Sequence, residues 1–140
     1  MSFRNIVVGV SNAPTSQAAG RQAFELAELT GATVHVVTAI EASEDEVVEI
    51  GSDRFVLSDR DAAQSSIEAF VRSLGSSAPS RVVVVDSKPG DALVEVAEQV
   101  DADLIVVGNV RMQGFGRLLG SVGNDVSHHA PCSVLIVKTV

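Results

Sequence analysis

Large aromatic side chains are nearly absent from this 140-residue chain, which holds five phenylalanines and neither tryptophan nor tyrosine. Basic residues are also scarce, since 10 lysines and arginines stand against 18 acidic residues and leave a formal net charge of −8. Nucleic-acid binding depends on clustered basic side chains and on aromatic rings that stack on bases. We therefore exclude nucleic acid as the main partner.

The chain has a single cysteine, Cys132, which rules out an internal disulfide. A lone cysteine beside an apolar segment is typically a small buried side chain rather than a reactive thiol. No apolar run approaches the roughly 20 residues that a membrane-spanning helix needs. The N-terminus is typical of a strand rather than of a signal peptide. We expect a cytoplasmic protein with no membrane contact.

Five short segments rich in β-branched residues recur along the chain, at 6–10, 34–39, 82–85, 104–107 and 134–137. Their apolar residues stand at successive positions, which is typical of parallel strands covered on both faces. Segments with apolar side chains at helical spacing separate them. This βαβαβαβαβ order predicts one α/β domain over the whole chain, with a doubly wound five-stranded parallel sheet and helices on both faces.

The sequence also predicts where several elements end. Gly31 and Gly75 follow the first two helical segments and are expected to cap their C-termini. Asp91 is expected to be the N-cap of the third helix. The acidic stretch 41–46, together with Glu49, is expected to form a solvated loop that leads into the second helix.

Two strand orders are plausible for such a sheet, 3-2-1-4-5 and 2-1-3-4-5. In both, ligands bind beyond the carboxyl ends of the strands, where the direction of winding reverses. The second order is flavodoxin-like and needs a phosphate loop after the first strand, but that loop lacks glycine and the aromatics that sandwich a flavin are missing. If the order is 3-2-1-4-5, the loops at 11–14 and 108–121 come together at the point where the winding reverses.

The second of these loops, GNVRMQGFGRLLGS, contains features of a phosphate-binding loop. Gly108 would let a ligand lie against the backbone. Gly120 and Ser121 would open the fourth helix, whose free N–H groups and dipole attract an anion. Arg111 could grip a phosphate through two hydrogen bonds or stay solvated. The same residues could instead serve only the geometry of a turn and a helix cap.

No catalytic constellation accompanies this loop. The chain lacks a nucleophile elbow, a CxxC pair and the Gly-Lys-Ser/Thr ending of a Walker A loop. His128 and His129, with Asp125 at helical spacing, are expected to be histidines at a helix end rather than metal ligands. We expect no enzyme, or at most slow ATP hydrolysis.

On several segments the chain resembles the universal stress protein family, over essentially its whole length. The matching segments are IVVGV at 6–10, DLIVVGN at 103–109, RLLGSV at 117–122, HAPC at 129–132 and VLIV at 134–137. Their order and distances are specific, although no single one is decisive. The resemblance implies a sheet of order 3-2-1-4-5, a role in the stress response and, as in the nucleotide-binding members, an adenine nucleotide as ligand.

Two departures from the family pattern fall at the expected ligand site. Arg111 replaces the second glycine, with only eight residues between it and Gly120, and Ser11 replaces the Asp that resembles a ribose or metal contact in ATP-binding members. The predicted ligand is ATP or AMP, with or without Mg²⁺, and the acidic stretch disfavours ATP more than AMP. The alternative is a nucleotide-free dimeric interaction module. The predicted contacts are Gly9, Ser11, Ala39, Val107, Gly108, Arg111, Gly120, Ser121 and Val122.

The last predicted strand lies at an edge of the sheet, and its centre carries no charge. An exposed apolar edge strand is an aggregation liability unless it is paired or blunted. Antiparallel pairing with a second copy would satisfy its free N–H and C=O groups. Family members commonly dimerise through this strand, so the resemblance implies a homodimer through Val134, Leu135, Ile136 and Val137.

Overall fold

The computed structural model describes residues 3–11, 14–40, 46–50, 53–57, 59–108 and 121–138. Its main sheet has five parallel strands in the order β5-β2-β1-β6-β7, which is 3-2-1-4-5 when these strands alone are counted. The predicted order is confirmed, and the flavodoxin-like order is excluded. The strands are β1 (Asn5–Gly9), β2 (Thr33–Ile40), β5 (Ser80–Asp86), β6 (Leu104–Gly108) and β7 (Ser133–Val137).

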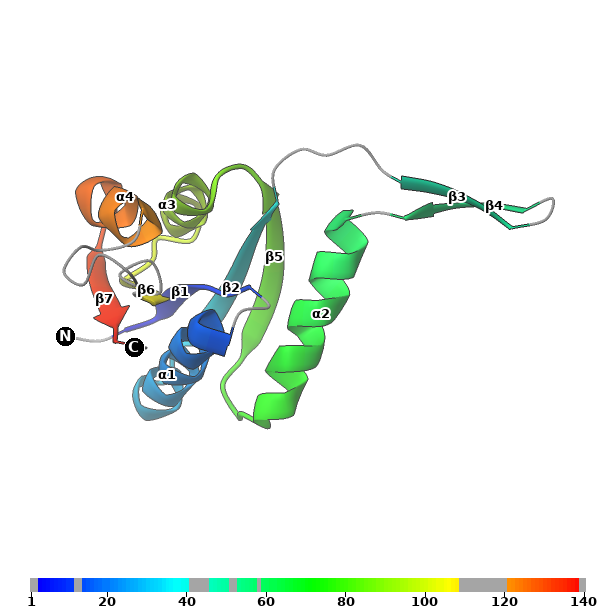
Figure 1. The fold of residues 1–140 in the computed structure, drawn as a ribbon. Coiled ribbons are helices and arrows are strands. Elements are labelled where there is room, and N and C mark those ends of the chain that lie inside the picture. Colours follow the sequence, from blue (N-terminus) through cyan, green and yellow to red (C-terminus); the bar gives the residue numbers. More distant parts are fainter. Residues whose placement is uncertain are drawn as a thin grey trace.

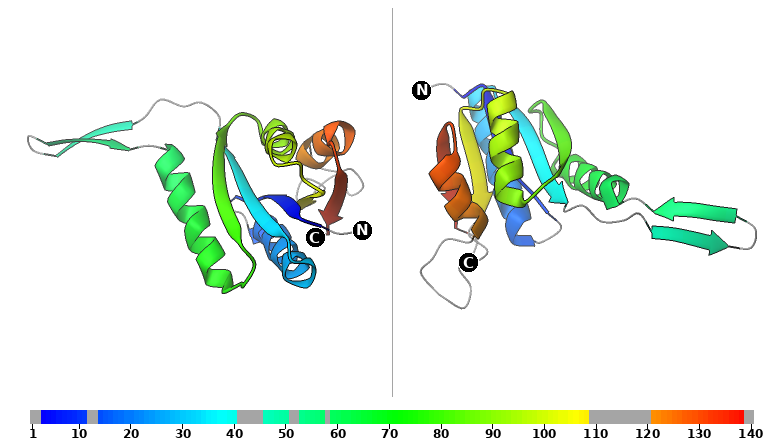
Figure 2. Two further views of the ribbon diagram at one scale, coloured as in Figure 1. Left: turned by 180° about the vertical axis from the view of Figure 1, so that it is seen from behind. Right: turned by 90° about the horizontal axis from the view of Figure 1, so that it is seen from above.

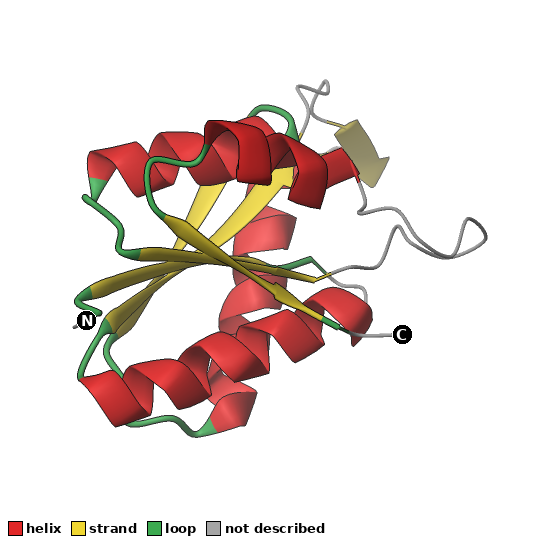
Figure 3. Ribbon diagram, turned by 90° about the vertical axis from the view of Figure 1, so that its left-hand side faces the viewer, coloured by secondary structure: helices red, strands yellow, loops and turns green. Residues whose placement is uncertain are grey.

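Helices cover both faces of this sheet, as the alternating pattern predicts (Figure 1 and Figure 3). The helices α1 (Pro14–Thr30) and α2 (Asp59–Leu74) pack on one face. The helices α3 (Pro89–Gln99) and α4 (Ser121–His129) pack on the other. None of the described helices is long and apolar enough to cross a lipid bilayer.

The strand β1 shows why the strands appear in the sequence as unbroken apolar runs. Successive side chains of a strand point to opposite faces of the sheet. Ile6 and Val8 therefore pack toward α1 and α2, whereas Val7 packs toward α3 and α4. All three are 0% exposed, and burying each contributes roughly 1.5–3 kcal/mol.

The helix ends follow the prediction in two cases and depart from it in one. Gly31 and Gly75 have backbone φ angles of 80° and 60°, the left-handed conformation that ends a helix. The expected N-cap at Asp91 is wrong, because α3 begins two residues earlier at Pro89, with Lys88 as the N-cap. The fixed φ of proline suits the first position of a helix. The Asp91 carboxylate lies in the first turn, where its negative charge interacts favourably with the positive end of the helix dipole.

A two-stranded antiparallel hairpin precedes α2 and is an addition to the predicted fold. It consists of β3 (Glu46–Ile50) and β4 (Asp53–Leu57), and Figure 2 shows it extending away from the main sheet. The expected solvated loop is therefore wrong for Glu46 and Glu49, while residues 41–45 lie outside the described part. The sequences EVVEI and DRFVL each contain adjacent β-forming residues, and a Gly-Ser pair lies between them. Two such segments joined by a short turn are typical of a hairpin, although their acidic residues also suit a solvated loop.

At the amino ends of the strands, polar side chains connect β1, β2 and β5. Arg81 Nε donates to His35 Nδ1 at 2.7 Å, so the neutral ring carries its proton on Nε2, which donates to Asn5 Oδ1 at 2.9 Å. Burial, and then the positive charge of Arg81, lower the pKa of His35 below its ordinary 6.5. Asp103 Oδ2 accepts the backbone N–H groups of Asn5 and Arg4, and these two bonds lower the pKa of that carboxyl.

Candidate functional site

The carboxyl ends of β1, β2 and β6 surround a cavity of about 210 Å³. The direction of winding reverses here, because the chain leads from β1 outward to β2 and β5 but from β6 outward to β7. A water molecule takes up roughly 30 Å³ in the liquid, so the cavity has room for an organic ligand rather than one ordered water. Open α/β sheets bind their ligands at this place.

Residues predicted as nucleotide contacts converge on this cavity from three strands and one helix. Arg111 and Gly120 lie outside the described residues. Ser121 begins α4, but its side chain is outside the described set. The predicted residues that line the cavity are Gly9, Ser11, Ala39, Val107, Gly108 and Val122.

Gly9 makes the base of the cavity compact. A Cβ atom at this position would lie 3.2 and 3.3 Å from the two Leu93 Cδ atoms, closer than most side-chain contacts. The missing side chain therefore lets α3 approach β1, and Leu93 becomes part of the cavity wall. A larger residue at position 9 would push Leu93 into the space that a ligand needs.

Most of the remaining wall is apolar. Val10, which lies between the predicted Gly9 and Ser11, is 3% exposed and lines the cavity. The sequence does not predict Val37, which is 2% exposed, or Pro89 and Leu93 from α3. Apolar walls with a few placed polar groups are typical of ligand pockets. The order of elements does predict that the start of α3 lies near the cavity. This helix follows the carboxyl end of β5 and so begins at the same edge of the sheet.

Two hydroxyl groups fix the loop after β1. Ser16 Oγ, in the first turn of α1, accepts the Ser11 backbone N–H at 2.8 Å and donates to the Ser11 carbonyl at 3.2 Å. The two side-chain oxygens lie 3.0 Å apart. Ser11 therefore presents to the cavity a hydroxyl held against α1 and no negative charge.

The described lining of the cavity contains no lysine, arginine, aspartate or glutamate. Within this part of the site, only backbone N–H groups and hydroxyls can donate hydrogen bonds to an anion. Val122 and Gly123, which line the cavity, belong to the first turn of α4. The free N–H groups and positive dipole end of a helix start suit a phosphate.

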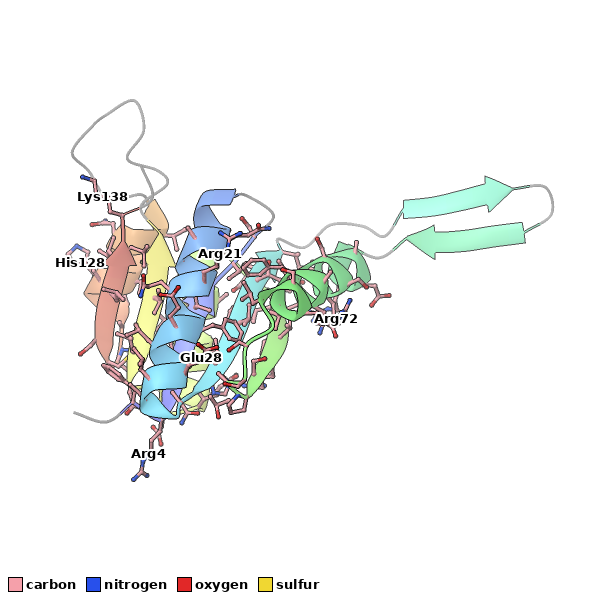
Figure 4. All side chains as sticks on the ribbon, turned by 90° about the horizontal axis from the view of Figure 1, so that it is seen from below. Arg4, Arg21, Glu28, Arg72, His128 and Lys138 are labelled. Carbon is pink, nitrogen blue, oxygen red and sulfur yellow. The ribbon has the colours of Figure 1, made fainter. Side chains whose placement is uncertain are left out.

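The histidine pair lies away from this cavity. His128 and His129 are exposed on the last turn of α4, where Figure 4 shows His128 on the outer side of the helix. His129 Nδ1 lies 2.9 Å from the Asp125 carbonyl oxygen one turn earlier. No group of three or more potential metal ligands occurs among the residues that the structure describes. Both histidines therefore lie at the end of a helix, as predicted.

Cys132 fits the prediction of an unreactive thiol. It is half-buried and packs against the apolar cluster on the α3 and α4 side of the sheet. Burial, and then the negative charge of Asp103, raise the pKa of the Cys132 thiol. The thiol therefore stays protonated at neutral pH, whereas the thiolate is the reactive form.

Known proteins resemble this chain, in one case over nearly its whole length and in another over part of it. The universal stress protein A homolog 1 of Coxiella burnetii is 31% identical over 144 residues, covering 98% of this chain and 97% of that protein. A universal stress protein of Methanothermobacter thermautotrophicus is 43% identical over 60 residues, but this match spans only 41% of the relative's length.

Two solved structures with bound nucleotides share the fold. One is a universal stress protein in complex with cAMP, with a TM-score of 0.77 and 30% identity, covering 100% of both chains. The other is a universal stress protein from Archaeoglobus fulgidus in complex with dAMP, with a TM-score of 0.67 and 27% identity, covering 99% of this chain and 100% of that one.

The family model for universal stress proteins matches residues 2–138. The strand order, the switch-point cavity and the full-length relatives agree with this match. The chain belongs to the universal stress protein family.

Proposed function

We propose that this protein binds an adenine nucleotide as a regulatory ligand in the cavity between β1 and β6, and that it acts in the stress response of the cytoplasm. One observation carries the proposal: residues predicted from sequence as nucleotide contacts converge on one cavity at the switch point. Two related structures, which contain cAMP and dAMP, support the class of ligand.

The nucleoside part fits the apolar end of the cavity. Gly9, Ser11 and Ala39 would form one side, and Leu93 and Val107 the other. A planar base gains hydrophobic stabilisation between such walls. The phosphate would lie at Gly108 and the start of α4, with Gly120, Ser121 and Arg111 as further contacts. We propose these as the site residues.

A nucleotide with one phosphate suits the described lining better than Mg²⁺-bound ATP. Mg²⁺ is usually held by one or two carboxylates together with phosphate oxygens, and the described part of the lining has no carboxylate. A triphosphate also brings more negative charge into a site whose described residues offer no basic side chain. We therefore propose AMP or a related monophosphate as the preferred ligand, without Mg²⁺.

We propose that this ligand is bound without efficient turnover. Hydrolysis needs a positioned base for the attacking water, such as a histidine or a carboxylate. The polar residues in the described lining are Ser11, Ser16 and Thr38, and the hydroxyl that each carries is a poor base at neutral pH. The role that fits is that of a sensor whose nucleotide occupancy is read by another protein.

The second candidate function is a nucleotide-free interaction module, which the serine at position 11 favours. In either case we propose a homodimer through β7. This strand lies at the edge of the sheet, and among the described strands it pairs only with β6. Leu135 and Ile136 pack against opposite faces of the core yet remain half-buried, so a second copy could cover them further.

Two measurements test nucleotide binding. Because the chain has no tryptophan or tyrosine, any co-purified adenine nucleotide would dominate its absorbance near 260 nm. Calorimetric titration with AMP, cAMP and ATP, each with and without Mg²⁺, measures affinity directly. We expect the monophosphates to bind without a Mg²⁺ effect. No heat at millimolar ligand would end the nucleotide proposal, and tighter binding of ATP with Mg²⁺ would contradict the monophosphate preference.

A matched pair of variants locates the site. Ala39→Phe places a ring in the cavity and should abolish the heat of AMP binding. Ala62→Phe adds the same ring at an exposed position of α2, away from the cavity, and should bind AMP like the wild type. Equal binding by both variants would show that AMP binds elsewhere.

A further inference from the structure

Leu93 closes the inner end of the switch-point cavity. The helix α3 begins at the carboxyl edge of the sheet and runs back toward the start of the parallel strand β6. Pro89 and Leu93 both line the cavity and stand four residues apart on this helix, so Leu93 lies one turn, roughly 6 Å, deeper. Val96 and Ala97, in the next turn, are buried core residues outside the lining. The cavity therefore ends at Leu93, which is itself 2% exposed.

The side chain of Leu93 lies against the backbone of Gly9. Its two Cδ atoms stand 3.2 and 3.3 Å from the position that a Cβ on Gly9 would take, and its Cγ stands 3.6 Å from it. Side chains alternate between the faces of a strand, so this position faces α3 and α4, as Val7 does two residues earlier. Val37 and Val107 belong to the same apolar cluster as Leu93 and also line the cavity. The inner end is thus an apolar pocket on this face of the sheet.

This inner end suits the base of a nucleotide rather than its phosphate. The helix α3, which carries Leu93, packs mainly on β2 and β1, whereas α4, whose first turn is the proposed phosphate site, packs on β6 and β7. Leucine and valine side chains offer a phosphate no hydrogen bond, but they stabilise the apolar surface of a base by removing it from water. We therefore expect the base at Leu93 and the phosphate at the start of α4.

An apolar wall also selects which edge of the base can face it. The amino group at C6 of adenine and the ring nitrogen N7 need hydrogen-bond partners, and burying them against leucine would cost free energy. The C2–H group has no such need, and it lies on the six-membered ring, away from the attachment of the ribose. A purine with a substituent at C2, such as guanine with its amino group, would meet the Leu93 side chain there.

We propose that Leu93 determines the specificity of the site for its base, by packing against the C2–H edge of adenine and excluding purines with a substituent at C2. This inference rests on the proposed function and adds the residue that selects the base. The wild type should bind AMP at least about tenfold more tightly than GMP or 2-methylthio-AMP, the discrimination that an apolar pocket achieves against one extra group.

Truncating Leu93 should admit an apolar substituent at C2. A leucine-to-alanine change inside a protein can leave a cavity of about 150 Å³ that accepts an apolar group. Leu93→Ala should therefore bind 2-methylthio-AMP about tenfold more tightly than the wild type does. It should bind AMP about three- to tenfold less tightly, as expected for the loss of roughly one buried CH₂ contact.

Leu104→Ala is the matched control for this change. Leu104, in β6, is 5% exposed, but it packs on the opposite face of the sheet and lies outside the cavity lining. The control should keep the wild-type preference for AMP over 2-methylthio-AMP, because a general loss of stability does not create room at C2. An equal gain for 2-methylthio-AMP in both variants would overturn the inference.

A second measurement uses the wild type, and it decides alone if Leu93→Ala does not fold. In the AMP complex of protein with ¹³C-labelled leucine methyl groups, nuclear Overhauser effects should connect the Leu93 methyl protons with H2 of adenine. The conservative variant Leu93→Met identifies these methyl signals by their loss. Contacts only with H8 or the ribose, equal wild-type affinity for AMP and 2-methylthio-AMP, or no gain in a folded Leu93→Ala would overturn the inference and leave nucleotide binding intact. If the wild type does not bind AMP, both proposals fall.

Discussion

Replacing His35 by valine should destabilise the protein at neutral pH and remove part of its sensitivity to acid. The imidazole accepts from Arg81 and donates to Asn5, and it is 6% exposed. Leaving a buried partner unsatisfied costs about 1–3 kcal/mol. Arg81 is exposed and Asn5 only half-buried, so water can replace part of each bond. We therefore expect the free energy of unfolding to fall by about 1–2 kcal/mol at pH 7.5.

The pH dependence follows from the lowered pKa of His35. Because the folded-state pKa lies below the ordinary 6.5, the unfolded chain binds a proton more readily than the folded one. The contribution of neutral His35 to stability is thus complete above about pH 6.5 and is lost as the pH falls toward the folded-state pKa. Protonation would also place a hydrogen on Nδ1, where Arg81 now donates.

Urea unfolding followed by far-ultraviolet circular dichroism measures this effect, since the chain has no tryptophan to report by fluorescence. The stability difference between wild type and His35→Val should shrink between pH 7.5 and pH 5. A stability difference that stays constant over this range would refute the role given to His35.

Other predictions concern the backbone and the edge of the sheet. Gly75→Ala should cost about 1–2 kcal/mol, because an L side chain disfavours its φ of 60° although no atom lies within 4 Å of the added Cβ; a wild-type melting temperature would argue against this. Gly20→Ala would bring a Cβ to 2.9 Å from the Phe70 ring and should cost about 1–3 kcal/mol, as thermal melts would show. Successive N–H groups of β7 point to opposite sides, so one of Leu135 and Ile136 has its N–H on the free edge rather than toward β6. The proline variant at that position should stay folded and become monomeric in sedimentation. A wild-type monomer at micromolar concentration, or a folded proline variant that stays dimeric, would contradict the dimer.

The sheet could be predicted from sequence because parallel strands are buried on both faces. Val7 and Val8 face different helical layers yet are equally buried, so the pattern of β1 is a continuous apolar run. Gly31 and Gly75 predict helix ends for a local reason too, because both adopt the positive φ that glycine accepts most readily. The charges of Glu46 and Glu49 favour a solvated loop in sequence analysis, although Val47 and Val48 between them have high β propensity and form part of the hairpin.

The cavity could be predicted only in part. Glycine and hydroxyl residues at the carboxyl ends of β1 and β6 are local signals, and they predict Gly9, Ser11 and Gly108 as site residues. Leu93 and Val37 are ordinary core residues by sequence, and their place in the cavity depends on how α3 and β2 pack against β1. Such contacts between distant elements leave no periodic trace in the chain.

The measurement that tests the central claim most directly is a nuclear magnetic resonance titration of the uniformly ¹⁵N-labelled protein with AMP. Saturable changes in amide shift should concentrate at the carboxyl edge of the sheet, at Gly9, Ser11, Ala39, Gly108 and Val122. In Figure 4 Arg4 marks the opposite edge, where the amides of Arg4 and His35 should stay unchanged. No shift at millimolar AMP, or shifts confined to surfaces away from the cavity, would contradict the account.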